Sequence, residues 1–426
     1  MSDRPVVRLI RPATEPLGLF LRPGHTDHRV LSQILSEGRT SLTGVVFDPS
    51  FIGPQEELRS EVRQRNLWAI LDTRMMELAT PSGYTERRST LPWAGPAPHR
   101  PQDLSGAGGR SAVAAIADFV AKYGFNGVLI GHYLERGARD TWFAIDLSLL
   151  RELRRQLDAR GLEDVSLYYT LAVPTAVFHD AAKRAELKTG LQGLEVDGLW
   201  LRIHPFGAAS GHLTLQRFIQ SCRDLHALNL PLIVEKAGSI GLPLLAFGAV
   251  SGIESGVSSG DKFDFSRLSR PPQDNKGFAA HARVYLPGLG VFLDRDTAIA
   301  FFGNRSLKAS FGCQNTACCR RGTQDTLADP RRHFVFTRME EVGAISQVPP
   351  QLRPTQYLDN ALRPATDRLG RVLQSALPDK VKIRLEKERR KLDGWRHTLG
   401  EISRDQPGAT VAVTPTRRAA RRRRGA

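Results

Sequence analysis

The sequence predicts an α/β protein: a (β/α)8 TIM-like barrel followed by a C-terminal zinc-binding, helical subdomain. Short apolar runs rich in β-branched and aromatic residues alternate with amphipathic stretches of helical period, which is typical of repeated β-α units around a parallel sheet. Seven or eight such units fit into about 240 residues, which favours closure into a barrel. An open doubly wound sheet, which typically uses fewer units, is the alternative.

The expected elements alternate along the chain, and the run GLPLLAFGAVSGIESG at 241–256 then continues as a helix and a strand. The expected strands lie at 17–21, 42–47, 67–72, 127–131, 165–171, 198–203 and 230–235. The expected helices lie at 54–65, 112–123, 147–160, 176–189 and 213–227.

In a barrel the β-α loops converge at the C-terminal ends of the strands, and functional side chains gather there. Asp72 ends the run LWAILDT, where a carboxylate can take up a proton or attack a carbon centre. An isolated aspartate after a strand more commonly caps the following turn, so both roles remain open for Asp72. The residues selected by the strand-end rule are Asp48, Asp72, His132, Arg202, His204, Glu235, Lys236 and Glu254.

Two segments outside the regular alternation are also informative. Residues 80–110 are rich in Pro, Gly and Ser and open beside Asp72, so we expect this long loop to cover a substrate. From residue 281, two apolar runs predict a β-hairpin with its turn at Asp294 to Asp296.

A cluster of Cys and His follows the expected hairpin. The segments FGCQNTACCRRG and DPRRHFVF place three cysteines within seven residues and a histidine near the start of a predicted helix. Four N or S ligands suit a closed, structural Zn²⁺ site, with no open position for catalysis. The alternative is that the cysteines are free and pack as small apolar groups. The predicted ligands are Cys313, Cys318, Cys319 and His333.

Charge and composition suggest the partner and the compartment. The formal net charge is +16, and 403–426 hold seven Arg and one Asp, which leaves +10 for the remaining residues. A basic chain favours polyanions, because each neutralised phosphate releases counterions, although a basic surface can also serve solubility alone. No run approaches the ~20 apolar residues that cross a bilayer, and no leader-like segment opens the chain, so we expect a cytoplasmic protein without membrane contact.

The expected organisation has four parts. Residues 1–280 form the barrel, 281–350 the hairpin and Cys/His zinc subdomain, 351–402 a helical extension, and 403–426 a disordered Arg-rich tail. The tail has no interleaved aromatic residue, so we expect it to bind phosphate without reading sequence. Its candidate nucleic-acid-binding residues are Arg417, Arg418, Arg421, Arg422, Arg423 and Arg424.

The order of these features resembles the tRNA-guanine transglycosylase family, including its relatives that place 7-deazaguanines in DNA. AILDT around Asp72 is similar to the family's strand that ends in an Asp-Ser motif, and GVSSGDKFDFSRLSR is similar to its Gly-rich segment before Phe-Asp and a later Arg. The hairpin, the Cys/His cluster and the next helix resemble the zinc subdomain that follows the family's barrel. After Asp72, this chain has TRMMEL where the family has a Ser-Gly-Gly turn.

The resemblance implies a transglycosylase (pentosyltransferase) that replaces guanine with a 7-deazaguanine base in tRNA or DNA. A carboxylate, either Asp264 or Glu254, would attack the anomeric carbon of the sugar, and Asp72 would handle the proton of the leaving or entering base. The implied cofactor is structural zinc, and whether two copies pair as a homodimer is left open. Two alternatives stand beside this enzyme: a non-catalytic nucleic-acid-binding barrel, and a barrel hydrolase acting on a small molecule.

Overall fold

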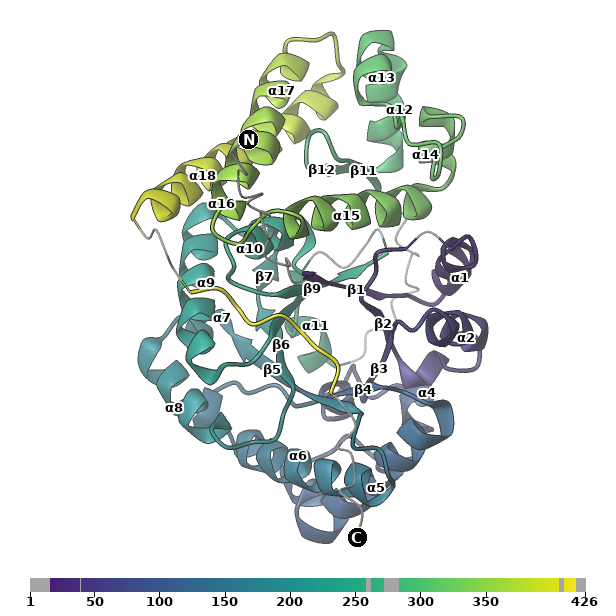
Figure 1. Ribbon diagram of the computed structural model, residues 1–426, viewed down its shortest axis with the longest axis vertical. Coiled ribbons are helices and arrows are strands. Elements are labelled where there is room, and N and C mark those ends of the chain that lie inside the picture. Colours follow the sequence, from purple (N-terminus) through teal and green to yellow (C-terminus); the bar gives the residue numbers. More distant parts are fainter. Residues whose placement is uncertain (1–15, 39, 258–261, 272–282, 406–409, 419–426) are drawn as a thin grey trace, which may run out of the picture.

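A computed structural model describes residues 16–38, 40–257, 262–271, 283–405 and 410–418. Eight parallel strands close into a barrel, so the predicted fold class is confirmed (Figure 1). Every strand expected from the sequence is present within a few residues of its expected bounds. The barrel strands, in order around the barrel, are β1 (Gly18–Arg22), β2 (Gly44–Phe47), β3 (Trp68–Asp72), β4 (Gly127–Ile130), β5 (Ser166–Pro174), β6 (Gly198–His204), β8 (Leu232–Glu235) and β9 (Gly252–Gly256).

Alternation along each strand sorts the side chains between the interior and the surrounding helices. Phe20, Trp200 and Ile233 belong to one buried cluster of bulky side chains in the barrel interior. Two residues further along β1 and β6, the next inward positions are Arg22 and Arg202. The barrel is therefore apolar in its middle layers and charged at the C-terminal ends of its strands, which we call the mouth.

Helices surround the barrel, and the helix that completes this ring comes from far along the chain. α15 (Pro330–Ser346) contacts both α1 and α10, so it covers the side of the barrel between β9 and β1 (Figure 1). Asp329 caps α15 by accepting from the Arg332 N–H, and Pro330 occupies its first turn, as is common at helix starts. The helices of the barrel segment are α1 (His28–Ser36), α2 (Glu56–Gln64), α3 (Met75–Leu78), α4 (Glu86–Ser89), α5 (Gly106–Tyr123), α6 (Thr141–Ala159), α7 (Thr175–Phe178), α8 (Ala181–Leu191), α9 (His212–Leu225) and α10 (Gly241–Ala246).

The C-terminal subdomain begins with the expected hairpin, but its turn is not where the sequence predicts it. β11 (Val284–Leu286) and β12 (Val291–Leu293) pair antiparallel, and the turn lies between them at 287–290. The turn predicted at Asp294 to Asp296 is wrong, because Asp294 caps the next helix by accepting from the Thr297 N–H at 2.9 Å. The helices that follow are α12 (Arg295–Gly303), α13 (Arg305–Phe311), α14 (Thr323–Ala328), α16 (Arg353–Tyr357), the π-helix η6 (Leu358–Leu362), α17 (Arg363–Leu373) and α18 (Asp379–Asp405).

The C-terminal segment corrects the expectation of a wholly disordered tail. α18 extends to Asp405, and residues 410–418 run in extended form along the barrel. The Ala412 N–H donates to the Gly248 carbonyl, and Arg417 hydrogen bonds to Asn66. Gly248 and Asn66 lie just before β9 and β3, so this segment crosses the end of the barrel opposite the mouth.

In the described part of the chain, we find no helix with the length and apolar character needed to span a bilayer.

Candidate functional site

A network of buried arginines and carboxylates fills the mouth, and its members come from most of the barrel strands. We call Arg22, Asp72, Arg74, Arg202, Glu235 and Glu254 the mouth network. Arg22 lies at its centre, with Nη1 at 2.6 Å from Asp72 Oδ2 and Nε at 2.5 Å from Glu254 Oε1. Arg202 forms ion pairs with both Asp72 and Glu235. Barrel closure therefore brings together the predicted candidates Asp72, Arg202, Glu235 and Glu254.

Asp72 is held as a carboxylate. Burial alone would raise its pKa, but Arg202, Arg74 and Arg22 hold the pKa of Asp72 well below its usual range. Its Oδ1 accepts from the Arg74 N–H at 3.1 Å, so Asp72 also caps the turn into α3, as in the alternative role considered above. With both oxygens engaged and 2 % of the residue exposed, Asp72 is placed to hold positive charge in position.

The other two carboxylates of the network differ in protonation tendency. Burial raises the pKa of Glu235, but Arg202, Arg22 and Lys236 more than offset this and lower it to about 2. Burial dominates at Glu254 and raises its pKa, although Arg22 opposes the shift. Glu254 also accepts from Trp200 Nε1 at 2.8 Å. Glu254 is therefore the carboxyl group of the network that takes up a proton most readily.

A short segment covers the mouth. β10 (Lys262–Phe263) pairs antiparallel with β7 (Phe206–Gly207), and α11 (Ser266–Ser269) follows it. The Leu268 carbonyl in α11 accepts from the Ser82 N–H, which belongs to the loop after β3. The Phe265 ring stacks on Tyr133, with ring centroids 3.6 Å apart. We call residues 262–270 the cap, and it closes an apolar cluster over the charged side chains.

Asp264 lies in the cap, away from the mouth network. The Ser266 hydroxyl donates to its Oδ1 at 2.6 Å, and Lys262 Nζ lies 3.1 Å from its Oδ2. Ser266 and then Lys262 lower the pKa of Asp264 to about 2, so it is ionised at neutral pH. Its side chain is 18 % exposed, and it shares no ion-pair partner with Asp72 or Glu254 among the described residues.

Asp264 opens onto a groove lined mainly by cations, which we call the basic groove. The cap forms one wall, and the exposed face of α18 and the residues before α9 form others. The groove has a volume of about 580 Å³, and six cationic side chains outnumber two acidic ones. Its charged lining residues are Lys262, Asp264, Arg267, Arg283, Arg384, Lys387, Glu388 and Lys391.

Two histidines selected by the strand-end rule lie apart from the network. His132 is fully buried and stacked on Trp142, and its Nδ1 lies 2.6 Å from Asp146 Oδ1. His204 accepts from the Phe265 N–H through Nδ1 at 3.1 Å, so it holds the cap at the residue that follows Asp264. Neither contact by itself indicates a catalytic role.

The predicted metal ligands come together. The ligand atoms of Cys313, Cys318, Cys319 and His333 lie within 4.8 Å of one another. Cys313 Sγ and Cys318 Sγ are 3.5 Å apart, and Cys319 Sγ is 3.6 Å from His333 Nδ1. Tetrahedral zinc with Zn–S bonds of about 2.3 Å requires sulfurs roughly 3.8 Å apart, so the donor set fits the ion.

The surroundings of the cluster orient its ligands. His333 Nε2 lies 3.1 Å from the Tyr285 carbonyl, which can accept a hydrogen bond from a protonated Nε2 and so leave Nδ1 free to bind a metal. The Thr326 hydroxyl donates to Cys319 Sγ at 3.4 Å. The cluster can therefore hold a metal ion that ties the cysteine loop to α15 and the hairpin.

The Arg-rich tail does not join the basic groove where the structure describes it. Arg417 hydrogen bonds to Asn66, and Arg418 lies 3.4 Å from Asp197, both at the end of the barrel opposite the mouth. These contacts correct the expectation that the tail is disordered at Arg417 and Arg418. Arg421, Arg422, Arg423 and Arg424 lie outside the described residues.

Sequence reasoning missed two central members of the network, Arg22 and Arg74. Arg22 could have been found from the alternation of β1, because it lies two residues after the inward-facing Phe20. Arg74 follows β3 in a left-handed conformation, with φ at 58°, which no local sequence signal indicates. The groove lysines of α18 were also missed, since they lie more than 100 residues after the last barrel strand.

Comparisons with known proteins find structural similarity at low sequence identity. No protein-family model and no curated protein matches the chain. The barrel is similar to a GH10 xylanase from Bispora, at 12 % identity and TM-score 0.38 over 59 % of this chain and 92 % of that one. It is similar to a putative phosphonomutase from Burkholderia cenocepacia at 17 % identity and TM-score 0.32, over 57 % of this chain and 87 % of that one. The carboxyl transferase domain of Rhizobium etli pyruvate carboxylase matches at 11 % identity and TM-score 0.37, over 84 % of this chain and 55 % of that one.

Proposed function

We propose that this protein binds nucleic acid in the basic groove and exchanges a base there, replacing guanine with a 7-deazaguanine. The observation that carries the proposal is the position of Asp264, an ionised carboxylate that opens onto a groove with an excess of cations. Lys and Arg side chains bind the phosphates of a nucleic acid and release the counterions condensed on them. The Asp264 carboxylate lines the same groove as these cations. The resemblance to the transglycosylases supplies the reaction class.

In the proposed reaction, an Asp264 oxygen forms a bond to the anomeric carbon of the sugar as the bond from that carbon to guanine breaks. The electron pair of the broken bond leaves with guanine, which takes up a proton. The ring nitrogen of the entering base then displaces the carboxylate and gives up its own proton. Splitting the exchange into two displacements is the logic of covalent glycosyl transfer.

The mouth network contributes electrostatics in this proposal. Glu254 has a raised pKa and is better suited than Asp72 to carry a proton, while Asp72 keeps Arg22 and Arg202 in place. A flipped base needs an aromatic face on which to stack, and Tyr133 offers one where Phe265 now lies. Base entry therefore requires Phe265 to move aside.

We assign the metal site to structural zinc. Three thiolates and one imidazole complete a tetrahedral set, and the closed set leaves no position for a reacting water. When bound, the ion would fix the cysteine loop to α15, the helix that covers the last side of the barrel.

The deciding test is the incorporation of labelled guanine or a labelled 7-deazaguanine into tRNA and into duplex DNA by the full chain. We expect incorporation by the wild type and none by Asp264→Asn, with nucleic-acid binding retained. Glu388→Gln is the matched control, because Glu388 lies in the same groove and pairs with Lys391. Equal incorporation by Asp264→Asn would refute the role of Asp264.

A second function is a nucleic-acid-binding barrel without chemistry. It is favoured by the mouth itself, where the arginines neutralise the carboxylates and the cap excludes solvent. Binding that weakens in Lys387→Ala and Lys391→Ala, together with no incorporation into either polymer, would establish this function in place of the enzyme.

A further inference from the structure

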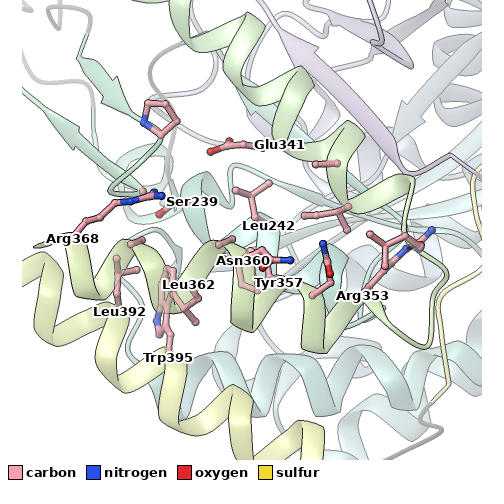
Figure 2. A pocket seen from close by; sticks show the side chains of 18 of the residues that line it. Ser239, Leu242, Glu341, Arg353, Tyr357, Asn360, Leu362, Arg368, Leu392 and Trp395 are labelled. Carbon is pink, nitrogen blue, oxygen red and sulfur yellow. Dashed lines mark hydrogen bonds between the residues drawn. The ribbon is translucent and has the colours of Figure 1, made fainter. Parts of the chain in front are cut away.

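A second cavity lies between the barrel and the C-terminal helices, and we call it the C-terminal cavity. It has a volume of about 280 Å³ and is enclosed by α10, the hairpin, α15, the α16–η6–α17 segment and α18. Figure 2 shows Glu341 directed into this space from one side, with Tyr357 and Asn360 in the middle and Trp395 on the other side. Ser239 and Gly290 also line the basic groove, but Asp264 and the groove lysines do not line this cavity.

The lining combines apolar surface with a few polar groups. Leu242, Ile345 and Leu392 supply aliphatic surface, and Tyr357 and Trp395 supply aromatic surface. Ligand sites in proteins have this character, and they usually have volumes of about 300–1,000 Å³. At about 280 Å³ this cavity is slightly smaller than that range, and it accommodates a molecule of one or two rings.

Glu341 brings to the cavity a carboxyl oxygen that accepts no hydrogen bond from the described residues. Its Oε1 accepts from the Tyr285 hydroxyl at 2.6 Å, which fixes the carboxyl group. Its Oε2 is buried and forms an ion pair with Arg338 Nη1 at 3.5 Å, but it accepts no hydrogen bond from any residue in the described part of the chain. An unsatisfied buried acceptor costs free energy that a ligand N–H or O–H would recover.

The backbone beside the cavity is also unusual. Residues Leu358–Leu362 form a π-helix, in which the Arg363 N–H donates to the Leu358 carbonyl five residues earlier. Pro364 follows directly and has no N–H for the Asn360 carbonyl, which explains why regular α-helical bonding fails here. Single π-turns of this kind occur frequently at functional sites, and Asn360 and Leu362 of this one line the cavity.

We propose that the C-terminal cavity binds a small, planar, largely apolar molecule whose N–H or O–H group donates to Glu341 Oε2. The aromatic and aliphatic walls hold the ring, and the carboxyl oxygen orients it. This site adjoins the basic groove at Ser239 and Gly290, but it does not depend on the proposed base exchange.

The test uses 5-fluoroindole as the probe and 5-fluorobenzothiophene, which has no N–H, as its matched control. Binding of each to the full chain is followed by ¹⁹F NMR titration. We expect saturable binding of the indole, with the benzothiophene about tenfold weaker because it leaves the Glu341 acceptor unsatisfied. Glu341→Leu is expected to bring the two affinities together.

A blocking variant makes the location testable without disturbing the core. Ala344 is exposed on α15 at the edge of the cavity, so Ala344→Trp is expected to fold and to abolish binding. Gln347→Trp, at the exposed end of the same helix and outside the lining, is the control and should bind normally.

Three results would overturn the proposal. The first is the absence of saturable binding to the full chain. The second is unchanged binding in Ala344→Trp. The third is binding only after removal of residues 1–15, because the Leu17 N–H donates to Ser346 at the end of α15 and the N-terminal segment would then be the occupant.

Discussion

Two buried polar clusters stabilise this molecule, and they reach electrical balance in different ways. In the mouth network, three arginines meet three carboxylates, so the chain itself supplies both signs of charge. The Cys/His cluster gathers three thiols and one imidazole within 4.8 Å, which become a stable set of anionic and neutral donors when a cation joins them. The first cluster is complete without a ligand, and the second is a site for one.

This difference determines how each cluster responds to the loss of one of its side chains. Loss of one partner in a balanced ionic network leaves a buried charge without compensation. Loss of a ligand from a metal site removes the ion and with it every contact that the ion makes. The two clusters can therefore be distinguished by mutation, by metal analysis and by pH.

The largest effect is expected for the double variant Cys318→Ser/Cys319→Ser. Because structural zinc supplies about 10–16 kcal/mol in small zinc domains, loss of two ligands should cost more than about 5 kcal/mol and release the ion. Elemental analysis of the purified protein should give one zinc per chain in the wild type and none in the variant. Cys222→Ser is the control, because this buried cysteine lies on α9 outside the cluster. A wild type without zinc would contradict the assignment.

The next largest effect is expected for Asp72→Ala. The substitution leaves Arg22, Arg74 and Arg202 without a shared partner in a buried site, which should reduce the free energy of unfolding by about 3–5 kcal/mol. Urea unfolding measures the change. Asp118→Ala is the control, since its ion pair with Arg160 is exposed and is expected to contribute at most about 1 kcal/mol. Equal effects of the two substitutions would show that the mouth network does not stabilise the barrel.

The pH dependence of stability should separate the carboxylates of the network. Asp72 and Glu235 have lowered pKa values when folded, so their stabilisation is present above their unfolded values of about 3.9 and 4.3 and is lost as the pH falls. For Glu235 this loss spans the interval down to its folded pKa of about 2. Glu254 has a raised pKa when folded, so its effect on stability has the opposite dependence on pH. Its protonation stabilises the folded state increasingly as the pH falls towards the pKa of the unfolded chain.

The measurement is thermal unfolding of the wild type and Glu254→Gln over a pH series. We expect the wild type to gain stability on mild acidification and to lose it below about pH 4, and the variant to show only the loss. A gain of equal size in the variant would show that another group is responsible.

The sequence predicted the barrel well because its information is local. Strands such as β3 are short apolar runs, and α2 and α9 have helical periodicity, so their positions follow from neighbouring residues. Ligands close together in sequence, such as Cys318 and Cys319, were found for the same reason. The hairpin turn was misplaced because Asp294 and Asp296, which resemble turn residues, serve instead at the start of α12.

The site was predicted only in part because barrel closure creates it. Asp72 and Glu254 were chosen as acids at strand ends, but their arginine partner Arg22 lies 50 positions from one and 232 from the other. No pattern within a single strand shows that a carboxylate will be neutralised by so distant a cation. The basic groove likewise needs α18 to fold back against the cap, which depends on tertiary packing and not on local periodicity.

The smallest effect on stability is expected at Asp264, which lies outside both clusters. Its partners Lys262 and Ser266 are close in sequence, and its side chain is partly exposed, so Asp264→Asn should change the free energy of unfolding by no more than about 1 kcal/mol. Urea unfolding in parallel with Asp72→Ala tests this. A loss of about 3 kcal/mol or more would place Asp264 among the structural ion pairs. A small loss leaves its ionised carboxylate available for chemistry, because a group that the fold does not need is free to serve the substrate.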